Sequence, residues 1–104
     1  MIKINRKNVI KDIKELTLNS NNLTYLPAEI GQLKQLTTLN LSENKLTHLL
    51  VEIGQLTYLT KLNLYNNQLT HLPVDIYQLT QLTILKLSHN KLTHLPVEIG
   101  NSHN

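Results

Sequence analysis

The sequence of 104 residues contains no cysteine, phenylalanine or tryptophan, and only three glycines and three prolines. Without cysteine, neither disulfide bonds nor thiolate metal sites can hold the fold together. Without phenylalanine and tryptophan, the hydrophobic content of 40% is carried mostly by leucine and isoleucine. A core made of so few residue types packs well only if each layer repeats the last. These absences therefore favour a repetitive architecture.

Long apolar runs are also absent. No run approaches the ~20 residues that are needed to cross a bilayer, so we predict no membrane span. The sequence begins without the apolar segment of a signal peptide. Together with the lack of cysteine, this favours a cytoplasmic location, and delivery outside the cell is left open.

Positive charge is concentrated at the N-terminus. Five basic residues against Asp12 give residues 1–14 a net charge of +4, whereas five lysines against six acids give the remainder −1. The total of +3 therefore reflects the N-terminal segment, and the rest of the chain is nearly neutral. We do not predict nucleic-acid binding from this distribution.

The sequence repeats with a period of 23 residues. Residues Leu46–Gly54 recur at Leu92–Gly100 with one change, Leu50 in place of Pro96. A fixed period of this length indicates a stack of small units rather than one globular core. We expect an N-terminal cap or degraded half-repeat, with Ile2, Ile4, Val9 and Ile10 available to cover the first leucine layer. The predicted boundaries are 1–12 for this cap and 13–35, 36–58, 59–81 and 82–104 for four repeats, the last incomplete.

Each repeat begins L-x-x-L-x-L-x-x-N-x-L and continues x-x-L-P-x-x-I-x-x-L. The L-x-L pair has a period of two, so both leucines face one way from a short strand. Strands that are one repeat apart must then stack in parallel at about 4.8 Å. The second half, such as Pro27–Leu33, is expected to form a short helical turn, with proline at its first position and an acid in its first turn.

The asparagine of the motif is a polar residue flanked by core leucines. A buried amide is tolerable only when it is hydrogen-bonded, and Asn can bond both its own loop and the backbone of a neighbouring repeat. We therefore predict a structural ladder. Its members are Asn21, Asn44, Asn67 and Asn90.

These residues carry the signature of the leucine-rich-repeat family, which the chain resembles from Ile13 to Ile99. The 23-residue length and the L-P-x-E-I-G-x-L segment are similar to the type found in bacterial and Ras-group leucine-rich-repeat proteins. The resemblance implies an α/β fold: a right-handed solenoid with short parallel strands on the concave face and short helical or 3-10 turns on the convex face. It also implies that partners dock on the concave sheet or its edges, but does not identify the partner.

The side chains between the inward leucines of each strand are expected to point onto the concave face. Over the last two strands, Tyr65 beside Ile84 has the composition of an interface anchor, and Lys61, Lys86 and His89 would orient a partner. We therefore predict a non-enzymatic protein–protein interaction module. The residues predicted to contact its protein partner are Lys61, Asn63, Tyr65, Ile84, Lys86, Ser88 and His89.

The sequence departs from the repeat pattern in two places and has no recognisable C-terminal cap. Leu50 replaces the proline of the second repeat, and Tyr77 replaces the glycine found at Gly31. An uncovered leucine layer and strand edge are prone to association. The alternative hypothesis is therefore a homodimer or larger assembly, formed through the C-terminal end with Leu95 and Ile99 or through the concave face.

No catalytic, cofactor or metal site is expected. His48, His71 and His94 form one column, with Tyr25 at the same place in the first repeat. A ladder presents parallel side chains about 5 Å apart, whereas zinc ligands must converge on a point. The sequence contains no nucleophile–base grouping, glycine-rich phosphate loop or metal-ligand spacing, so we predict neither enzymatic activity nor a bound cofactor.

Overall fold

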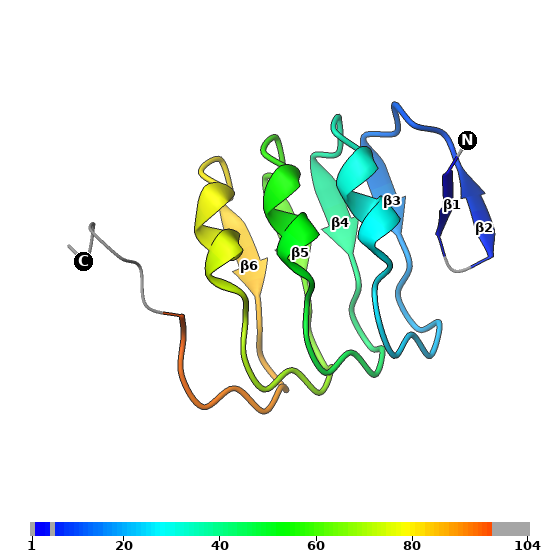
Figure 1. The fold of residues 1–104 in the computed structure, drawn as a ribbon. Coiled ribbons are helices and arrows are strands. Elements are labelled where there is room, and N and C mark those ends of the chain that lie inside the picture. The colour runs from blue at the N-terminus through cyan, green and yellow to red at the C-terminus, as the bar shows by residue number, and fades with distance from the viewer. Residues whose placement is uncertain (1, 5, 97–104) are drawn as a thin grey trace.

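The computed structural model describes residues 2–4 and 6–96, which form a row of similar turns (Figure 1). The end of the predicted fourth repeat, 97–104, lies outside the described residues and includes Ile99, one of the two residues assigned to self-association. Within the described part of the chain, no helix is long and apolar enough to span a membrane.

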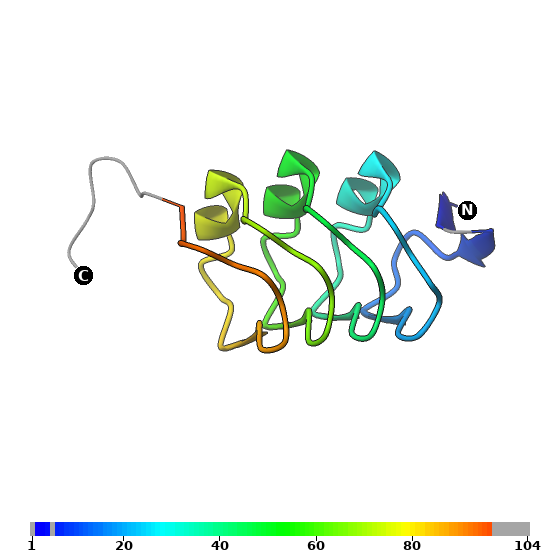
Figure 2. The same ribbon diagram turned by 90° about the horizontal axis from the view of Figure 1, so that it is seen from below.

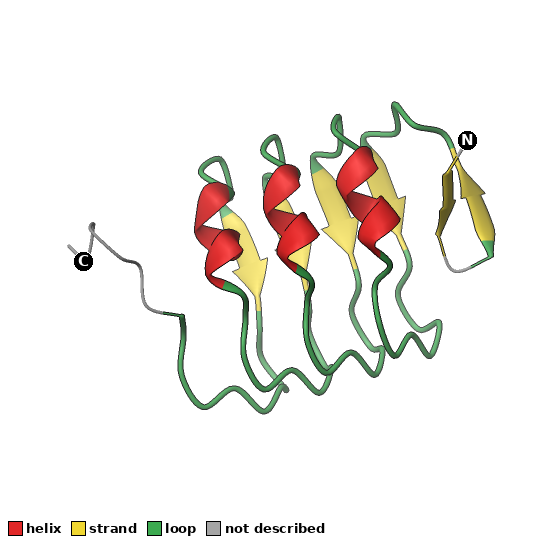
Figure 3. Cartoon of the chain, viewed as in Figure 1, coloured by secondary structure: helices red, strands yellow, loops and turns green. Residues whose placement is uncertain are grey.

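Nine short elements make up the described chain. An antiparallel pair comes first, formed by β1 (Ile2–Ile4) and β2 (Lys7–Val9). A parallel sheet follows, in the order β3 (Glu15–Thr17), β4 (Thr38–Asn40), β5 (Lys61–Asn63) and β6 (Ile84–Lys86). The connections between its strands contain the 3-10 helices η1 (Ala28–Gln32), η2 (Val51–Gln55) and η3 (Val74–Gln78). Strands and helices occupy opposite sides of the stack (Figure 3).

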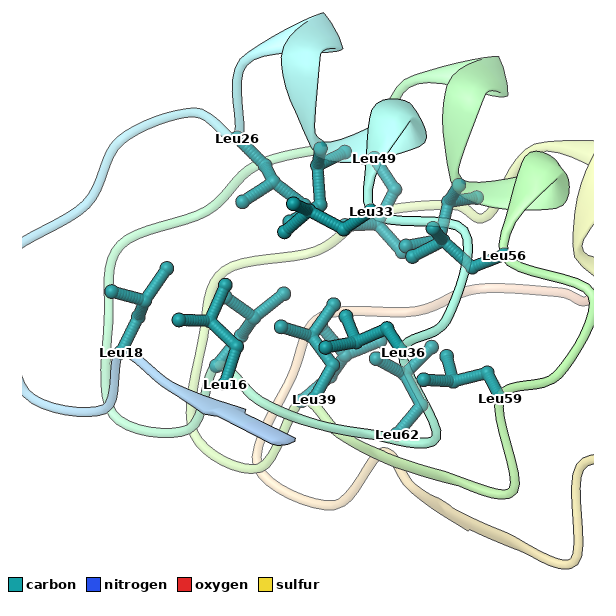
Figure 4. Packing of buried hydrophobic residues seen from close by; sticks show 14 of the residues in the cluster. Leu16, Leu18, Leu26, Leu33, Leu36, Leu39, Leu49, Leu56, Leu59 and Leu62 are labelled. Carbon is teal, nitrogen blue, oxygen red and sulfur yellow. The ribbon is translucent and has the colours of Figure 1, made fainter. Parts of the chain in front are cut away.

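The sheet keeps the 23-residue register of the sequence at each pairing. Leu16 pairs with Leu39, Leu39 with Leu62, and Leu62 with Leu85. The first three of these leucines are at most 1% exposed and pack with the leucines that return from the helical side (Figure 4). The predicted solenoid of parallel strands and 3-10 turns is confirmed. Figure 2 shows the same coil seen along the sheet from below.

The prolines lie one position earlier than expected. Pro27 and Pro73 cap η1 and η3 from an extended backbone with ψ of 154° and 150°, instead of occupying the first helical position. Leu50 adopts the same conformation, φ −78° and ψ 158°, before η2. The replacement of proline by leucine is therefore accommodated without a change of backbone, and Leu50 is half-buried rather than exposed.

The β1–β2 pair packs beside η1 at the start of the stack. Its inward side chains Ile2, Ile4 and Val9 belong to the hydrophobic core, and Ile4 is fully buried. Ile10 differs from the expectation, because 64% of its surface is exposed. The chain turns at 11–12 before entering β3, so Ile10 lies outside the alternation that buries Val9.

The asparagine ladder joins adjacent repeats through side-chain hydrogen bonds. The Nδ2 of Asn44 donates to the carbonyl of Leu18 at 3.0 Å and of Leu41 at 2.9 Å. Its Oδ1 accepts the backbone N–H groups of Asn21 and Leu23. Each of these asparagines therefore ties the strand end of its own repeat to that of the preceding one.

Asn67 and Asn90 repeat this pattern one and two repeats later. Asn21 differs from the other three, because it is exposed and its Nδ2 donates to the carbonyl of Asn19 within its own repeat. The difference follows from position, since the first repeat has no preceding repeat whose strand end Asn21 could bind.

Glycine allows neighbouring 3-10 helices to approach closely. A Cβ added to Gly54 would lie 2.8 Å from the backbone carbonyl oxygen of Asp75 in η3 and 2.6 Å from the Oε1 of Gln78. At Gly31 the nearest atom is the Oε1 of Gln55, also at 2.6 Å, at the far end of a flexible side chain. The two glycines therefore differ in what would resist a larger side chain.

Replacing Asn44 by alanine should lower the free energy of unfolding by about 2–4 kcal/mol, because buried backbone groups of two repeats lose their partners. The matched change Asn21→Ala should cost about 1 kcal/mol or less, since Asn21 is exposed and donates within its own repeat. Urea denaturation followed by circular dichroism measures both. Equal losses would show that the ladder does not depend on contacts between repeats.

Gly54→Ala should destabilise the fold by about 1–3 kcal/mol, because the added methyl group meets backbone that cannot move independently. Gly31→Ala should be close to neutral, since the Gln55 side chain can rotate away and alanine favours a helical turn over glycine. Thermal unfolding of the two variants under the same conditions tests this order. A larger loss for Gly31→Ala would contradict it.

Candidate functional site

The exposed face of the parallel sheet, which is the concave face of the solenoid, carries two side chains from each strand. They flank the inward leucine, and successive side chains of a strand point to opposite faces. The first positions form the column Glu15, Thr38, Lys61 and Ile84. The second positions form the column Thr17, Asn40, Asn63 and Lys86.

An open hollow of about 230 Å³ lies over β4, β5 and β6. Four of the predicted partner-binding residues line it: Lys61, Asn63, Ile84 and Lys86. Thr38 and Asn40 of β4 line it as well and were missed by the sequence prediction. Their signal was available, because the 23-residue register places them beside Lys61 and Asn63.

A second hollow, of about 650 Å³, adjoins the first at the last strand. Asn63 and Lys86 line both hollows, and Tyr65 and Ser88 line the second. Its apolar lining comes from Leu85 and Leu87, the inward leucines of the fourth repeat. Neither hollow has a carboxylate among the described residues that line it. The two hollows together therefore present lysine, amide, hydroxyl and apolar groups to solvent.

His89 joins this site through its contact with Tyr65. The two ring centroids are 5.0 Å apart and the ring planes cross at 61°, an edge-to-face arrangement. This geometry is the one that aromatic rings prefer. His89 has a positive φ of 61°, at the bend that follows each strand. The bend therefore brings the imidazole of the fourth repeat against the phenol of the third.

The side chain of Asn63 is engaged within its own repeat. Its Oδ1 accepts the backbone N–H of Tyr65 at 3.0 Å, so it holds the bend from which Tyr65 projects. Asn40 does the same for Ser42, accepting from both the N–H and the hydroxyl. Lys86 takes this place in the fourth repeat and has no acceptor atom to offer. Asn63 thus supports the site through the backbone, and Lys86 leaves a charged group at the face.

The histidine column lies outside this face. His48, His71 and His94 are exposed, and the Nδ1 of each lies 2.9–3.1 Å from the hydroxyl of the threonine that precedes it. Among the described residues, no group of three or more His, Cys, Asp or Glu is placed to hold a metal ion.

Two leucines at the C-terminal side of the stack are more exposed than their counterparts one repeat earlier. Leu85 is 37% exposed, whereas its counterpart Leu62 is fully buried. Leu95, one of the two residues assigned to self-association, is 58% exposed, compared with 4% for Leu72. Tyr77, at the place of the glycines, is exposed and donates its hydroxyl to the carbonyl of Pro96 at 2.7 Å.

Several known proteins are similar to this chain in sequence and structure. A family profile described as leucine rich repeat matches residues 11–69 and 51–92. Among solved structures, a leucine-rich-repeat protein of Leptospira interrogans is 55% identical over 86% of this chain, with a TM-score of 0.84. A search of curated protein sequences gave no significant match.

Two plant receptors are similar as well. The peptide hormone receptor RGFR1, solved in complex with RGF2, is 40% identical over 83% of this chain, with a TM-score of 0.73. The leucine-rich-repeat ectodomain of the receptor kinase SOBIR1 from Arabidopsis thaliana is 36% identical over 74%, with a TM-score of 0.66. The matched regions are 23%, 14% and 44% of the bacterial, RGFR1 and SOBIR1 chains, so this chain corresponds to less than half of each. The repeat, its register and these likenesses show that the chain belongs to the leucine-rich-repeat family.

Proposed function

We propose that this chain is a non-enzymatic protein-interaction module that binds its partner on the concave face over β5 and β6. The observation that carries the proposal is the meeting of Tyr65, Ile84 and two lysines around two adjoining hollows. Family membership supports an interaction role in general, since the similar structures include receptor ectodomains and one receptor solved with a bound partner. The concave face over β5 and β6 is proposed as the binding surface because of the side chains that it carries.

Tyr65 and Ile84 are suited to anchor a partner. Ile84 is 41% exposed, so a docking partner would remove a large apolar surface from water. Tyr65 is half-buried, and its edge-to-face contact with His89 limits the freedom of its ring before binding. A side chain ordered in advance loses less entropy on association, which is why rigid aromatic residues are frequent among interface anchors.

The sheet beneath these anchors is held by hydrogen bonds that a partner need not disturb. The N–H of Leu64 donates to the carbonyl of Lys86 at 2.9 Å, and the N–H of Asn66 to that of Ser88 at 3.0 Å. These bonds continue the pairing of β5 with β6 beyond the strand ends into the bend of Tyr65. The anchors therefore project from a rigid part of the scaffold, which supports precise placement of contacts.

Tyr65→Ala should weaken peptide ligands by about tenfold or more while the domain stays folded. The ligands are selected from a random displayed peptide library against the unmodified chain, and affinities are measured by fluorescence anisotropy. The matched control is Tyr25→Ala, because Tyr25 is 62% exposed but lies outside the concave columns. Circular dichroism verifies that both variants fold. The proposal fails if the selected peptides bind the two variants equally well.

A second candidate function is self-association through the leucine layer of the fourth repeat. The supporting observation is that Leu85 and Leu95 are exposed where their counterparts Leu62 and Leu72 are buried. Within the stack each such layer is covered by a repeat of the same composition, so a second copy offers a matching surface. Two copies that meet through the same layer would form a closed, symmetric dimer.

Leu95→Asp should dissociate such a dimer, because burial of an unpaired carboxylate in an apolar contact is unfavourable. The matched control is Val51→Asp on η2 of the second repeat, where the valine is 56% exposed. Light-scattering mass after size exclusion, over about a hundredfold range of concentration, distinguishes the two variants. A monomeric unmodified chain throughout the range would exclude this candidate.

A further inference from the structure

The concave face carries charges of opposite sign at its two ends. Glu15 lies on β3, Lys61 on β5 and Lys86 on β6, and all three are exposed. The face positions of β4 between them hold Thr38 and Asn40, which are uncharged. The sign of the charge therefore changes along the direction in which the strands stack.

The bends after the strands carry an acidic side chain nearer to β3 and an imidazole beside β6. At the same place in each repeat, one period apart, a residue has a positive φ between 57° and 61°: Ser20, Glu43, Asn66 and His89. The acid of this column belongs to the second repeat, next to β4, and the histidine belongs to the fourth. The hydroxyl of Ser20 donates to the Oε1 of Glu43 at 3.1 Å, which holds that carboxylate toward the first repeat. Two separate columns thus place negative charge toward β3 and the basic side chain toward β6.

The two lysines are themselves close neighbours. Lys61 pairs in register with Ile84, and Lys86 lies two residues further along the adjacent strand. Strand spacing and rise place the two backbones about 8 Å apart, which is about one Debye length at physiological ionic strength, so the repulsion between the two charges is only partly screened. A carboxylate that binds between them relieves this repulsion. Among the described residues, none that lines this hollow is an acid that would do so.

We infer that the partner is an extended peptide segment whose charges are grouped in two blocks, an acidic block over β5–β6 and a basic block over β3. This inference rests on the proposed function and adds the chemistry of the partner. Its acidic residues contact Lys61 and Lys86, an apolar residue contacts Ile84, and its basic residue faces Glu15. Three strand gaps span about 14 Å, which an extended chain crosses in about four or five residues.

The N-terminal segment is the competing site for acidic ligands. It carries Lys3, Arg6, Lys7, Lys11 and Lys14. A purely acidic probe would be attracted there as well, so its binding would not report on the concave face. A probe without net charge removes this ambiguity, because it gains little from the total field of the protein.

The test compares two short peptides of the same composition, with blocked termini and no net charge. The first has a leucine, two glutamates, two serines and two lysines in that order, so that the leucine can reach Ile84, and the second has the glutamates and lysines alternating. Both are titrated into the uniformly ¹⁵N-labelled full chain, and amide shifts are followed by NMR. The block-charged peptide should bind about three- to tenfold more tightly and shift amides of 61–65 and 84–89.

Charge removal on the two surfaces provides the matched comparison. The double variant Lys61→Gln and Lys86→Gln should abolish the preference for the block-charged peptide. The control variant Lys3→Gln and Lys7→Gln removes the same charge from the β1–β2 pair and should retain the preference. Glu15→Gln should reduce it, because the basic end of the peptide loses its counter-charge.

Three results would overturn the inference: equal affinities of the two peptides, including no binding of either; shifts confined to residues 3–14; or a preference that survives the double lysine substitution. Its failure is distinguishable from failure of the proposed function. The binding of peptides selected from the random library depends on Tyr65 whether or not their charges are grouped in blocks. If the Tyr65 dependence holds and the charge preference does not, the concave face binds peptides but selects them by other chemistry.

Discussion

The hydrogen bonds of the buried asparagine side chain hold neighbouring repeats in place, and much of the structure depends on them. Each strand of the parallel sheet has only three residues, and backbone hydrogen bonds between repeats continue beyond the strand ends, as from the N–H of Leu18 to the carbonyl of Asn40. Asn44 adds two bonds to the preceding repeat: its Nδ2 donates to the carbonyl of Leu18, and its Oδ1 accepts the N–H of Leu23. Because the amide is buried between leucine layers, it must keep all of these partners. A shift of one residue between repeats would break them and turn the inward leucines outward.

This register also determines what the concave face presents. Lys61 lies beside Ile84, and Asn63 beside Lys86, because their strands pair without an offset from the repeat period. The same constraint that buries the leucines therefore sorts the outward side chains into columns. A column can change its chemistry from one repeat to the next without any change of backbone. The gradient from Glu15 to Lys86 arises in this way, on a scaffold whose four strands are otherwise alike.

The convex side is subject to a tighter steric constraint. The 3-10 helices η2 and η3 approach so closely that Gly54 leaves no room for a methyl group. At the corresponding place of the third repeat, Tyr77 directs its hydroxyl to the carbonyl of Pro96 instead. Tyr77 therefore places an aromatic ring where the second repeat has a glycine.

The sequence by itself was sufficient for the repeat length, the inward leucines, the parallel strands and the short helical turns, because each follows from a period or a local conformational preference. The 3-10 alternative for these turns came from the family resemblance. Leu16, Leu39 and Leu62 are buried because the L-x-L spacing turns both leucines of each strand to the same face. Family membership likewise followed from the motif.

Other features depended on the tertiary structure, because they are set by atoms of neighbouring repeats rather than by residues nearby in the chain. Asn21 has the same motif as Asn44 but lacks a repeat before it, so its amide stays exposed. Asn63, which the sequence predicts to contact a partner, also supports the bend of Tyr65, because its Oδ1 accepts the N–H of Tyr65. The contact of Tyr65 with His89 joins residues of two repeats through a bend with positive φ. Hydrogen bonds and ring contacts of this kind need positions in space, which a linear pattern does not contain.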